Sequence, residues 1–299
     1  MESINELLGR GFSLWRDNLN LCLPHLLGFF FSLMALFAGI MAVIFSGLLP
    51  LEGLNETALQ EMQYVEDLEE MQVFWDQMEE HLASLQSSDI LQMASAILAV
   101  FVLIALVDAF FAAGAIGMSR QALEKGRSST SAMWSAGRRH FLGMFLAELL
   151  MTFIILMGIL LLLPLLGSGL EKLGLLAVAL ALIAIFYALA LTIILSTMPY
   201  ALVLEDLPPL RALFAAIDFF WYNKFDVAVL WLVVVALSLG LQMVSGAISS
   251  GQPGQGQPLS AITGMISLLV LAPLSNLWWT RLYMSRKGML KQDEKEDPW

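Results

Sequence analysis

The sequence predicts an all-helical, polytopic integral membrane protein with six transmembrane helices. Hydrophobic residues make up 59% of the 299 residues and charged residues only 14%, whereas soluble domains are nearer a quarter charged. Six apolar stretches reach the roughly 20 residues that a helix needs to cross the hydrocarbon core. Basic residues gather in alternate connections between these stretches, as they do in the cytoplasmic loops of membrane proteins.

The six predicted spans share their length and their low content of charge. They cover residues 23–49, 90–118, 141–166, 173–198, 227–248 and 259–283. The first apolar run is longer than the hydrophobic region of a cleavable signal peptide, so we expect it to remain as a span. Cys22 is the only cysteine, which excludes an internal disulfide and a cysteine metal cluster.

The distribution of charge predicts which ends of the spans face the cytoplasm. Connections 1–22, 119–140 and 204–226 and the stretch from Arg281 to the C-terminus hold 14 of the 15 Lys and Arg residues, and Lys172 is the exception. Since Lys and Arg are retained on the cytoplasmic side, we expect both termini to be cytoplasmic. The formal net charge of −11 and the lack of a strongly basic segment argue against nucleic acid as a partner.

Each odd-numbered span follows a short stretch of apolar, aromatic and basic residues. These stretches read LLGRGFSLWRDN, SAMWSAGRRHF and LRALFAAIDFFWYNKF. Amphipathic helices with Trp and Arg suit the headgroup layer of a membrane. We therefore predict three helix-pair units with cytoplasmic interfacial helices, in one membrane domain over residues 1–292 with a short cytoplasmic tail at 293–299. The alternative is that any span tends to have aromatic and basic flanks, without a repeat.

The connection 51–89 is predicted to lie outside the cell. Residues 52–89 hold eleven acidic side chains and no Lys or Arg, which the positive-inside rule places outside. Asn55, in the triplet Asn-Glu-Thr, is a possible glycosylation site on this side. No EF-hand spacing is present, so we predict no metal site.

The same segment has the pattern of an amphipathic helix. Its apolar side chains recur every three or four positions, at Met62, Val65, Leu68, Met71, Trp75, Met78, Leu82 and Leu85. Four acids crowd together and form a candidate outer acidic surface: Glu66, Asp67, Glu69 and Glu70. This helix could bind a cation, a protein partner or a second copy of the chain. Alternatively, it is a solvated cap whose acids keep it outside and soluble.

Two carboxylates lie inside predicted spans. Asp108 and Glu148 are about eight to ten residues from the cytoplasmic ends of their spans, which at 1.5 Å per residue is roughly 12 to 16 Å deep. A charge at such depth costs several kcal/mol, so we expect these groups to face protein or water, or to be protonated. With Asn276 they form a candidate intramembrane polar site. They could relay protons or ions, or they could form a structural pair with Asn276, Thr280 or Arg281.

Two predicted spans contain a proline. Pro273 in the sixth span and Pro164 near the end of the third each free a backbone carbonyl, which a neighbouring group can satisfy.

The three histidines lie in different connections or at span ends, and no H-E-x-x-H, G-x-S-x-G or P-loop pattern occurs. The serine-rich stretch 128–131 predicts a helix start rather than a phosphate site. We therefore predict no enzymatic activity, no cofactor and no metal.

Two span ends carry a family resemblance. The segments DAFFAAGAIGM, from Asp108, and MPYALVLE, ending at Glu205, resemble a family of six-span archaeal and bacterial membrane proteins. That family is related to the membrane domain of some glycerophosphodiester phosphodiesterases. The resemblance covers most of the chain but not the acidic segment, which looks like an insertion. It implies a prokaryotic, archaeal plasma membrane, and it implies no hydrolase activity because the catalytic domain is absent.

These observations favour a non-enzymatic integral membrane protein, a scaffold or accessory subunit. We expect it to act through membrane lipids, or through a protein partner or a second copy bound at segment 51–89. The alternative is a small transporter or channel that uses Asp108 and Glu148. The first hypothesis predicts that both carboxylates tolerate amide substitution, and the second predicts that Asp108→Asn abolishes flux.

Overall fold

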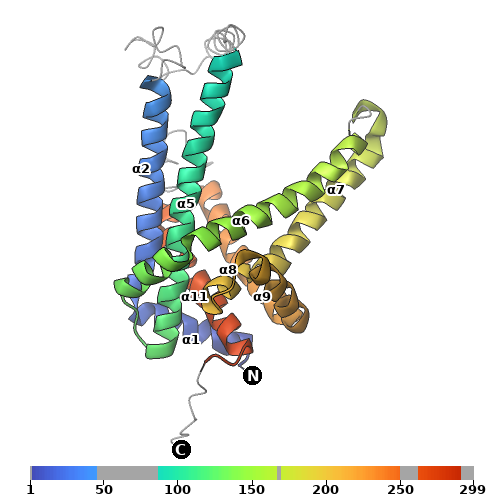
Figure 1. Ribbon diagram of the computed structural model, residues 1–299. Helices are drawn as coiled ribbons and strands as arrows, with labels where there is room; N and C mark the ends of the chain where they lie inside the picture. Colours follow the sequence, from blue (N-terminus) through green and yellow to red (C-terminus); the bar gives the residue numbers. More distant parts are fainter. Residues whose placement is uncertain (1, 46–86, 167–169, 250–261, 291–299) are drawn as a thin grey trace, which may run out of the picture. The chain divides into compact units, whose positions relative to one another are not determined.

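A computed structural model describes residues 2–45, 87–166, 170–249 and 262–290 of the chain (Figure 1). These residues are helical between short turns and contain no β-strand. Six of the helices are long and apolar enough to cross a membrane. They cover Leu19–Val43, Ile90–Lys125, Thr130–Leu160, Val178–Leu204, Pro209–Val244 and Ile262–Arg286. The prediction of an all-helical protein with six spans is therefore confirmed.

Where the structure describes the connection, the helices follow one another with few residues between them. In chain order they are α1 (Ile4–Asp17), the 3-10 helix η1 (Leu19–Cys22), α2 (Leu23–Phe45), α5 (Ser87–Lys125), α6 (Thr130–Leu166), α7 (Leu170–Leu195), α8 (Met198–Leu204), α9 (Pro209–Ser249), the π-helix η3 (Ser267–Leu271) and α11 (Ala272–Arg286). They form two compact units: a smaller unit, Phe30–Val107, and a larger unit, Met1–Phe29 together with Asp108–Trp299.

The smaller unit contains the second part of α2 and the first part of α5. A Cβ atom on Gly39 would overlap with the side chain of Val100, so the glycine lets the two helices approach closely. Other apolar side chains are exposed, among them Phe37 at 61% and Phe101 at 66%. An apolar surface of this kind requires lipid or another helix to cover it.

The larger unit has its core around the short helix α8. Every residue of α8 except Pro199 is buried. Helix α8 packs against α6, α9 and α11, and α1 packs against α11 and α9. Two stacked aromatic pairs join these helices: Tyr200 with Trp279, with ring centroids 6.3 Å apart, and Phe219 with Tyr283, 4.6 Å apart.

The spans bury little of their most apolar surface. In the most apolar window of each span, at most 28% of the residues are buried. In the larger unit, Phe186 on α7 is 66% exposed and Leu232 on α9 is 59% exposed. In a membrane protein, such side chains face lipid or the spans of a partner.

The three stretches that were predicted as interfacial helices differ in how they connect to the spans that follow them. Helix α1 is a separate helix that begins with a capping box between Ser3 and Glu6. The second stretch continues without a break into its span, because α6 already begins at Thr130. The third is part of α9, which has a kink at Asn223 (φ −127°, ψ 30°), whose side chain donates to the carbonyl of Phe219. The arrangement in three helix-pair units is not confirmed.

Several predicted features lie outside the described residues. They are the glycosylation site Asn55, the outer acidic surface of Glu66, Asp67, Glu69 and Glu70, and the tail 293–299. The predictions made for them stay predictions.

Candidate functional site

Polar side chains gather at one place in the larger unit, which we call the polar end. It consists of α1, the turn between α5 and α6, the residues after α8 and the last turns of α11. Hydrogen bonds and ion pairs connect all four parts, as the following contacts show.

Two asparagines after α1 hold the turn between α5 and α6. Asn18 is buried, and its Nδ2 donates to the carbonyls of Leu14 (3.0 Å) and Gly126 (3.1 Å), while its Oδ1 accepts from the Ser128 amide (2.9 Å). Asn20 donates to the Ser128 carbonyl and accepts from its hydroxyl. Gly126 ends α5 with φ of +72°, a conformation that favours glycine. The predicted helix start is confirmed, since α6 begins directly after this turn.

Small residues then hold the first turns of α6 against α5. A Cβ atom on Gly137 would lie 2.8 Å from Cζ of Phe110, and one on Gly117 would overlap with Ala136. Close approach of two helices requires small residues at their contact. The residues on the opposite face of α6 consequently remain on the surface of the unit.

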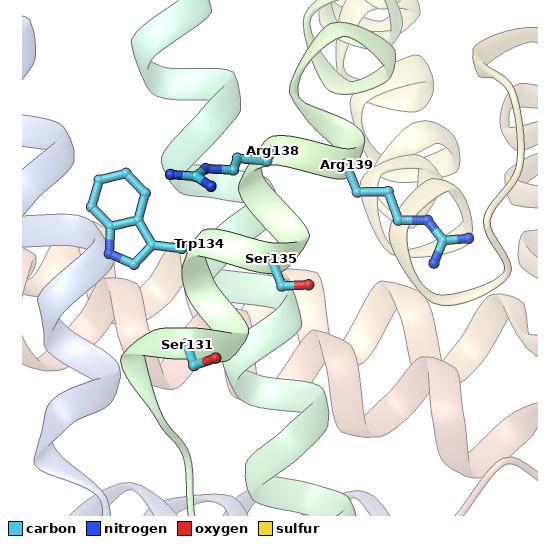
Figure 2. Close-up of a pocket in the computed structure, with 5 residues that line it drawn as sticks. All are labelled: Ser131, Trp134, Ser135, Arg138 and Arg139. Carbon is cyan, nitrogen blue, oxygen red and sulfur yellow. The ribbon is translucent and has the colours of Figure 1, made fainter.

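That exposed face of α6 carries a shallow, open pocket of about 520 Å³ (Figure 2). It is lined by Ser131, Trp134, Ser135, Arg138 and Arg139. In Figure 2, Trp134 and Arg138 extend to one side of the helix, and Ser135 and Arg139 extend to the other. The pocket therefore combines two hydroxyls, two guanidinium groups and one indole on a single helix.

Aromatic contacts fix the indole of this pocket. The Trp134 ring lies with its centroid 5.3 Å from that of Phe110 and 6.5 Å from that of Phe111, both on α5. The side chain is nevertheless 43% exposed. A Trp that is anchored on one side and open on the other is typical of a residue at the membrane interface.

The two arginines of the pocket differ in their partners. Arg139 forms an ion pair with Asp206, whose carboxylate also lies 3.6 Å from Nδ1 of His140. Within the described part of the chain, Arg138 forms neither a hydrogen bond nor an ion pair. Asp206 follows α8 with φ of +59°, the left-handed conformation that usually favours glycine. Asp206 therefore contacts Arg139 of α6 from a backbone conformation that is unfavourable for most residues other than glycine.

The neighbouring carboxylate, Glu205, points to a different helix. It accepts hydrogen bonds from Tyr283 Oη (2.5 Å) and Lys287 Nζ (2.8 Å) at the end of α11. Burial alone would raise the pKa of Glu205, but these hydrogen bonds and the charge of Lys287 lower it below its ordinary value. Glu205 caps the end of α8 and Asp206 follows it, and together they connect α8 to α11 and α6.

A second set of charges ties α1 to α11 and α9. Arg281 donates to both carboxylate oxygens of Glu2, with Nη2 2.8 Å from Oε1 and Nε 3.0 Å from Oε2. Arg286 donates to the Glu2 carbonyl (2.9 Å) and to Asp226 (2.7 Å), and its side chain is only 4% exposed. Fork-shaped contacts of this kind are the strong form of the Arg–carboxylate pair. This network was not predictable from sequence patterns, because Glu2 and Arg281 lie 279 positions apart.

The structure brings two of the three predicted intramembrane residues together. Asp108 on α5 is exposed, Glu148 on α6 is half-buried, and the two carboxylates lie near enough for their charges to interact. Asn276 donates instead to the hydroxyl of Ser119, which is buried. Thr280 and Arg281, the other possible partners of the two carboxylates, also donate elsewhere. Thr280 donates to the Asn276 carbonyl, and Arg281 binds Glu2.

The freed carbonyl near Pro273 has a partner. Cys22 Sγ lies 2.9 Å from the carbonyl oxygen of Leu269, four residues before Pro273. The intervening backbone contains the π-helix η3. Among the described residues, no group of three or more His, Cys, Asp or Glu side chains could hold a metal ion.

Comparisons with protein-family models, with curated proteins and with solved structures find no match to this chain. The resemblance to the membrane domain associated with glycerophosphodiester phosphodiesterases therefore stays a prediction.

Proposed function

We propose that this chain is a non-enzymatic integral membrane protein, a scaffold or accessory subunit that acts through membrane lipids or protein partners. In this proposal it resides in a prokaryotic plasma membrane, with both termini in the cytoplasm and segment 51–89 outside. The observation that carries the proposal is the contrast between the paired charges of the polar end and the uncovered apolar surface of the spans.

The polar end supports a structural use of its charged groups. Glu2, Glu205 and Asp226 each bind a Lys or Arg on α11. A largely buried ion pair such as Glu2 with Arg281, 11% and 12% exposed, is strongly destabilising when it loses one partner, which supports a structural role for these charges. Since at most 28% of each apolar window is buried, the spans offer their surface to lipid or to partner helices.

Native mass spectrometry of the protein, released gently from its own membrane, tests the proposed function. A reproducible protein companion, or retained lipid on the 33.0 kDa chain, supports a scaffold or accessory subunit. A bare chain, free of lipid and companion under mild activation, contradicts it. A companion would also be identified directly by its mass.

The proposed orientation has a separate test. Because Cys22 is the only cysteine, Cys22→Ala provides a background without thiols. In that background, a membrane-impermeant maleimide applied to intact cells should label Asn55→Cys but not Lys295→Cys. Labelling of Lys295→Cys alone would reverse the orientation.

A second candidate function is supported by the proximity of Asp108 and Glu148. Paired carboxylates inside spans are typical of proton and ion pathways. A small transporter or channel that uses them should lose cation- or proton-dependent flux in liposomes on Asp108→Asn. Flux that is unchanged in Asp108→Asn and Glu148→Gln would remove both groups from the mechanism, in favour of the scaffold.

A further inference from the structure

We infer that the pocket on α6 binds the phosphate group of an anionic membrane lipid. This inference rests on the proposed function, because it names the lipid chemistry through which the protein acts. The pocket residue Ser131 belongs to the serine-rich stretch 128–131, whose predicted helix start is confirmed, and the inference adds phosphate binding at this residue.

The pocket offers the donors that a phosphate needs. Ser131 and Ser135 stand one turn apart on α6 and supply two hydroxyls. Arg138 stands one turn further along and extends to the other side of the pocket from Ser135 (Figure 2). Its guanidinium forms no hydrogen bond or ion pair with the described residues. Guanidinium groups bind phosphate through charge-assisted, often bidentate hydrogen bonds, which a neutral donor cannot match. The arrangement thus contains one cation that is available to an anion without breaking an existing contact.

The remainder of the same helix face favours a lipid over a soluble phosphate. Leu142, Leu146 and Leu149 follow Arg138 at intervals of three or four residues, and they are 56%, 49% and 55% exposed. One stripe along α6 therefore changes from hydroxyls and guanidinium to apolar side chains over about one turn. A phospholipid has the same order of groups, with a phosphate followed by acyl chains. Trp134, which is open on one side, lies at the level of Ser131 and Ser135, about two turns before Leu142.

Arg139 has a secondary part in this site. Its ion pair with Asp206 is solvent-exposed, with side-chain exposures of 65% and 53%. Exposed ion pairs contribute little to stability, so a lipid phosphate can share Arg139 without disturbing the fold. We therefore expect Arg138 to contribute most of the affinity, with Arg139 contributing less because Asp206 competes for it.

Lipid titration in native mass spectrometry tests the site, with dioleoylphosphatidylglycerol and dioleoylphosphatidylcholine as probes. The wild-type chain should retain one phosphatidylglycerol at an activation energy that removes phosphatidylcholine. Arg138→Gln should bind phosphatidylglycerol about tenfold more weakly, the loss expected for one charge-assisted contact. Ser131→Ala combined with Ser135→Ala should weaken it less. Arg211→Gln is the matched control, because it removes the same charge from an exposed position on another helix.

The outcomes separate this site from the proposed function. Equal binding by wild type, Arg138→Gln and Arg211→Gln would overturn the site, while a protein companion in the membrane-released sample would still support a scaffold. Equal losses in Arg138→Gln and Arg211→Gln would also overturn it, since they indicate a general effect of charge. Displacement of the lipid by equimolar inorganic phosphate or glycerol phosphate would show that the ligand is a free phosphate. Arg138→Lys, which keeps the charge but loses the fork, should restore part of the affinity.

Discussion

Cys22 donates its thiol hydrogen to the backbone carbonyl of Leu269, across a distance of 2.9 Å. In a regular α-helix, that carbonyl would accept from the amide of the residue four positions later. That residue is Pro273, which has no N–H. The sole cysteine of the chain thus satisfies a carbonyl that a proline leaves free inside a span.

Substitutions of Cys22 and of Pro273 should reveal this contact. We expect Cys22→Ala to lower the free energy of unfolding in mixed micelles by about 1 kcal/mol, because a carbonyl in an apolar environment loses its donor. Pro273→Ala restores an N–H near the carbonyl, so the effect of Cys22→Ala should be smaller in that background. A double-mutant cycle measures the difference. Additive effects would mean that the thiol does not act on this carbonyl.

Two glycines on α1 should respond to alanine in opposite directions. A Cβ atom on Gly11 would overlap with the indole of Trp278, whose Nε1 donates to the Leu8 carbonyl (3.1 Å). Gly11→Ala should therefore separate α1 from α11 and destabilise the fold. Gly9 has open space around its Cα, so Gly9→Ala should stabilise the helix by about 0.5 to 1 kcal/mol. The free energies of unfolding of both variants, measured in the same micelles, allow the comparison. A loss of stability in Gly9→Ala would contradict the open space around Gly9 on α1.

The two asparagines after α1 should differ in importance. Asn18→Ala removes three hydrogen bonds at a buried position, and we expect a cost of about 2 to 4 kcal/mol. Asn20→Ala removes two contacts at an exposed position, where water can replace them, and should cost about 1 kcal/mol or less. Proteolysis of the turn between α5 and α6 provides a local readout, since Asn18→Ala should make it faster. Equal effects of the two substitutions would contradict the assigned difference in burial.

Stability should depend on the ionisation of Glu205. Its folded-state pKa is lowered, so its ionised form stabilises the fold at pH values above its unfolded pKa. This contribution is lost as the pH falls through the folded-state pKa. Glu205→Gln should therefore be less stable than wild type near neutral pH, and the difference should shrink on acidification. The midpoint of thermal unfolding, followed against pH, measures both effects.

Asp17→Asn is the control for that pH series, because Asp17 is 65% exposed and lies 3.7 Å from Arg16 in a loose pair. Its profile should follow that of the wild type. If Glu205→Gln follows the wild type as well, the contacts of Glu205 with Tyr283 and Lys287 do not stabilise the fold.

Sequence reasoning was sufficient for the spans, because their apolar length and the low charge within them are local properties. It was insufficient for partners that lie far apart in the chain. The freed carbonyl before Pro273 was predictable, whereas its donor Cys22 lies 247 positions away from that carbonyl. Arg281 was considered as a partner for intramembrane carboxylates, but it binds Glu2, because α1 folds back against α11.

The pocket on α6 was only partly visible in the sequence. The spacing of Ser131, Ser135 and Arg138 places them on one helix face, which the sequence analysis interpreted as part of an interfacial helix. It could not predict which face is covered, because that depends on the contact between Gly137 and Phe110 of another helix. The sequence also could not predict that Arg139 forms an ion pair with Asp206, whereas Arg138 has no partner in the described part of the chain.

The contact between Glu2 and Arg281, which are 279 positions apart, has a consequence for biosynthesis. Because α11 is translated after all the other spans, α1 leaves the ribosome long before its binding surface exists. During that interval α1, whose Leu7 is fully buried in the finished protein, lacks its contacts with α11. A nascent chain arrested before α11 therefore exposes the face of α1 that α11 covers in the finished protein, and the arrival of the last span conceals this face.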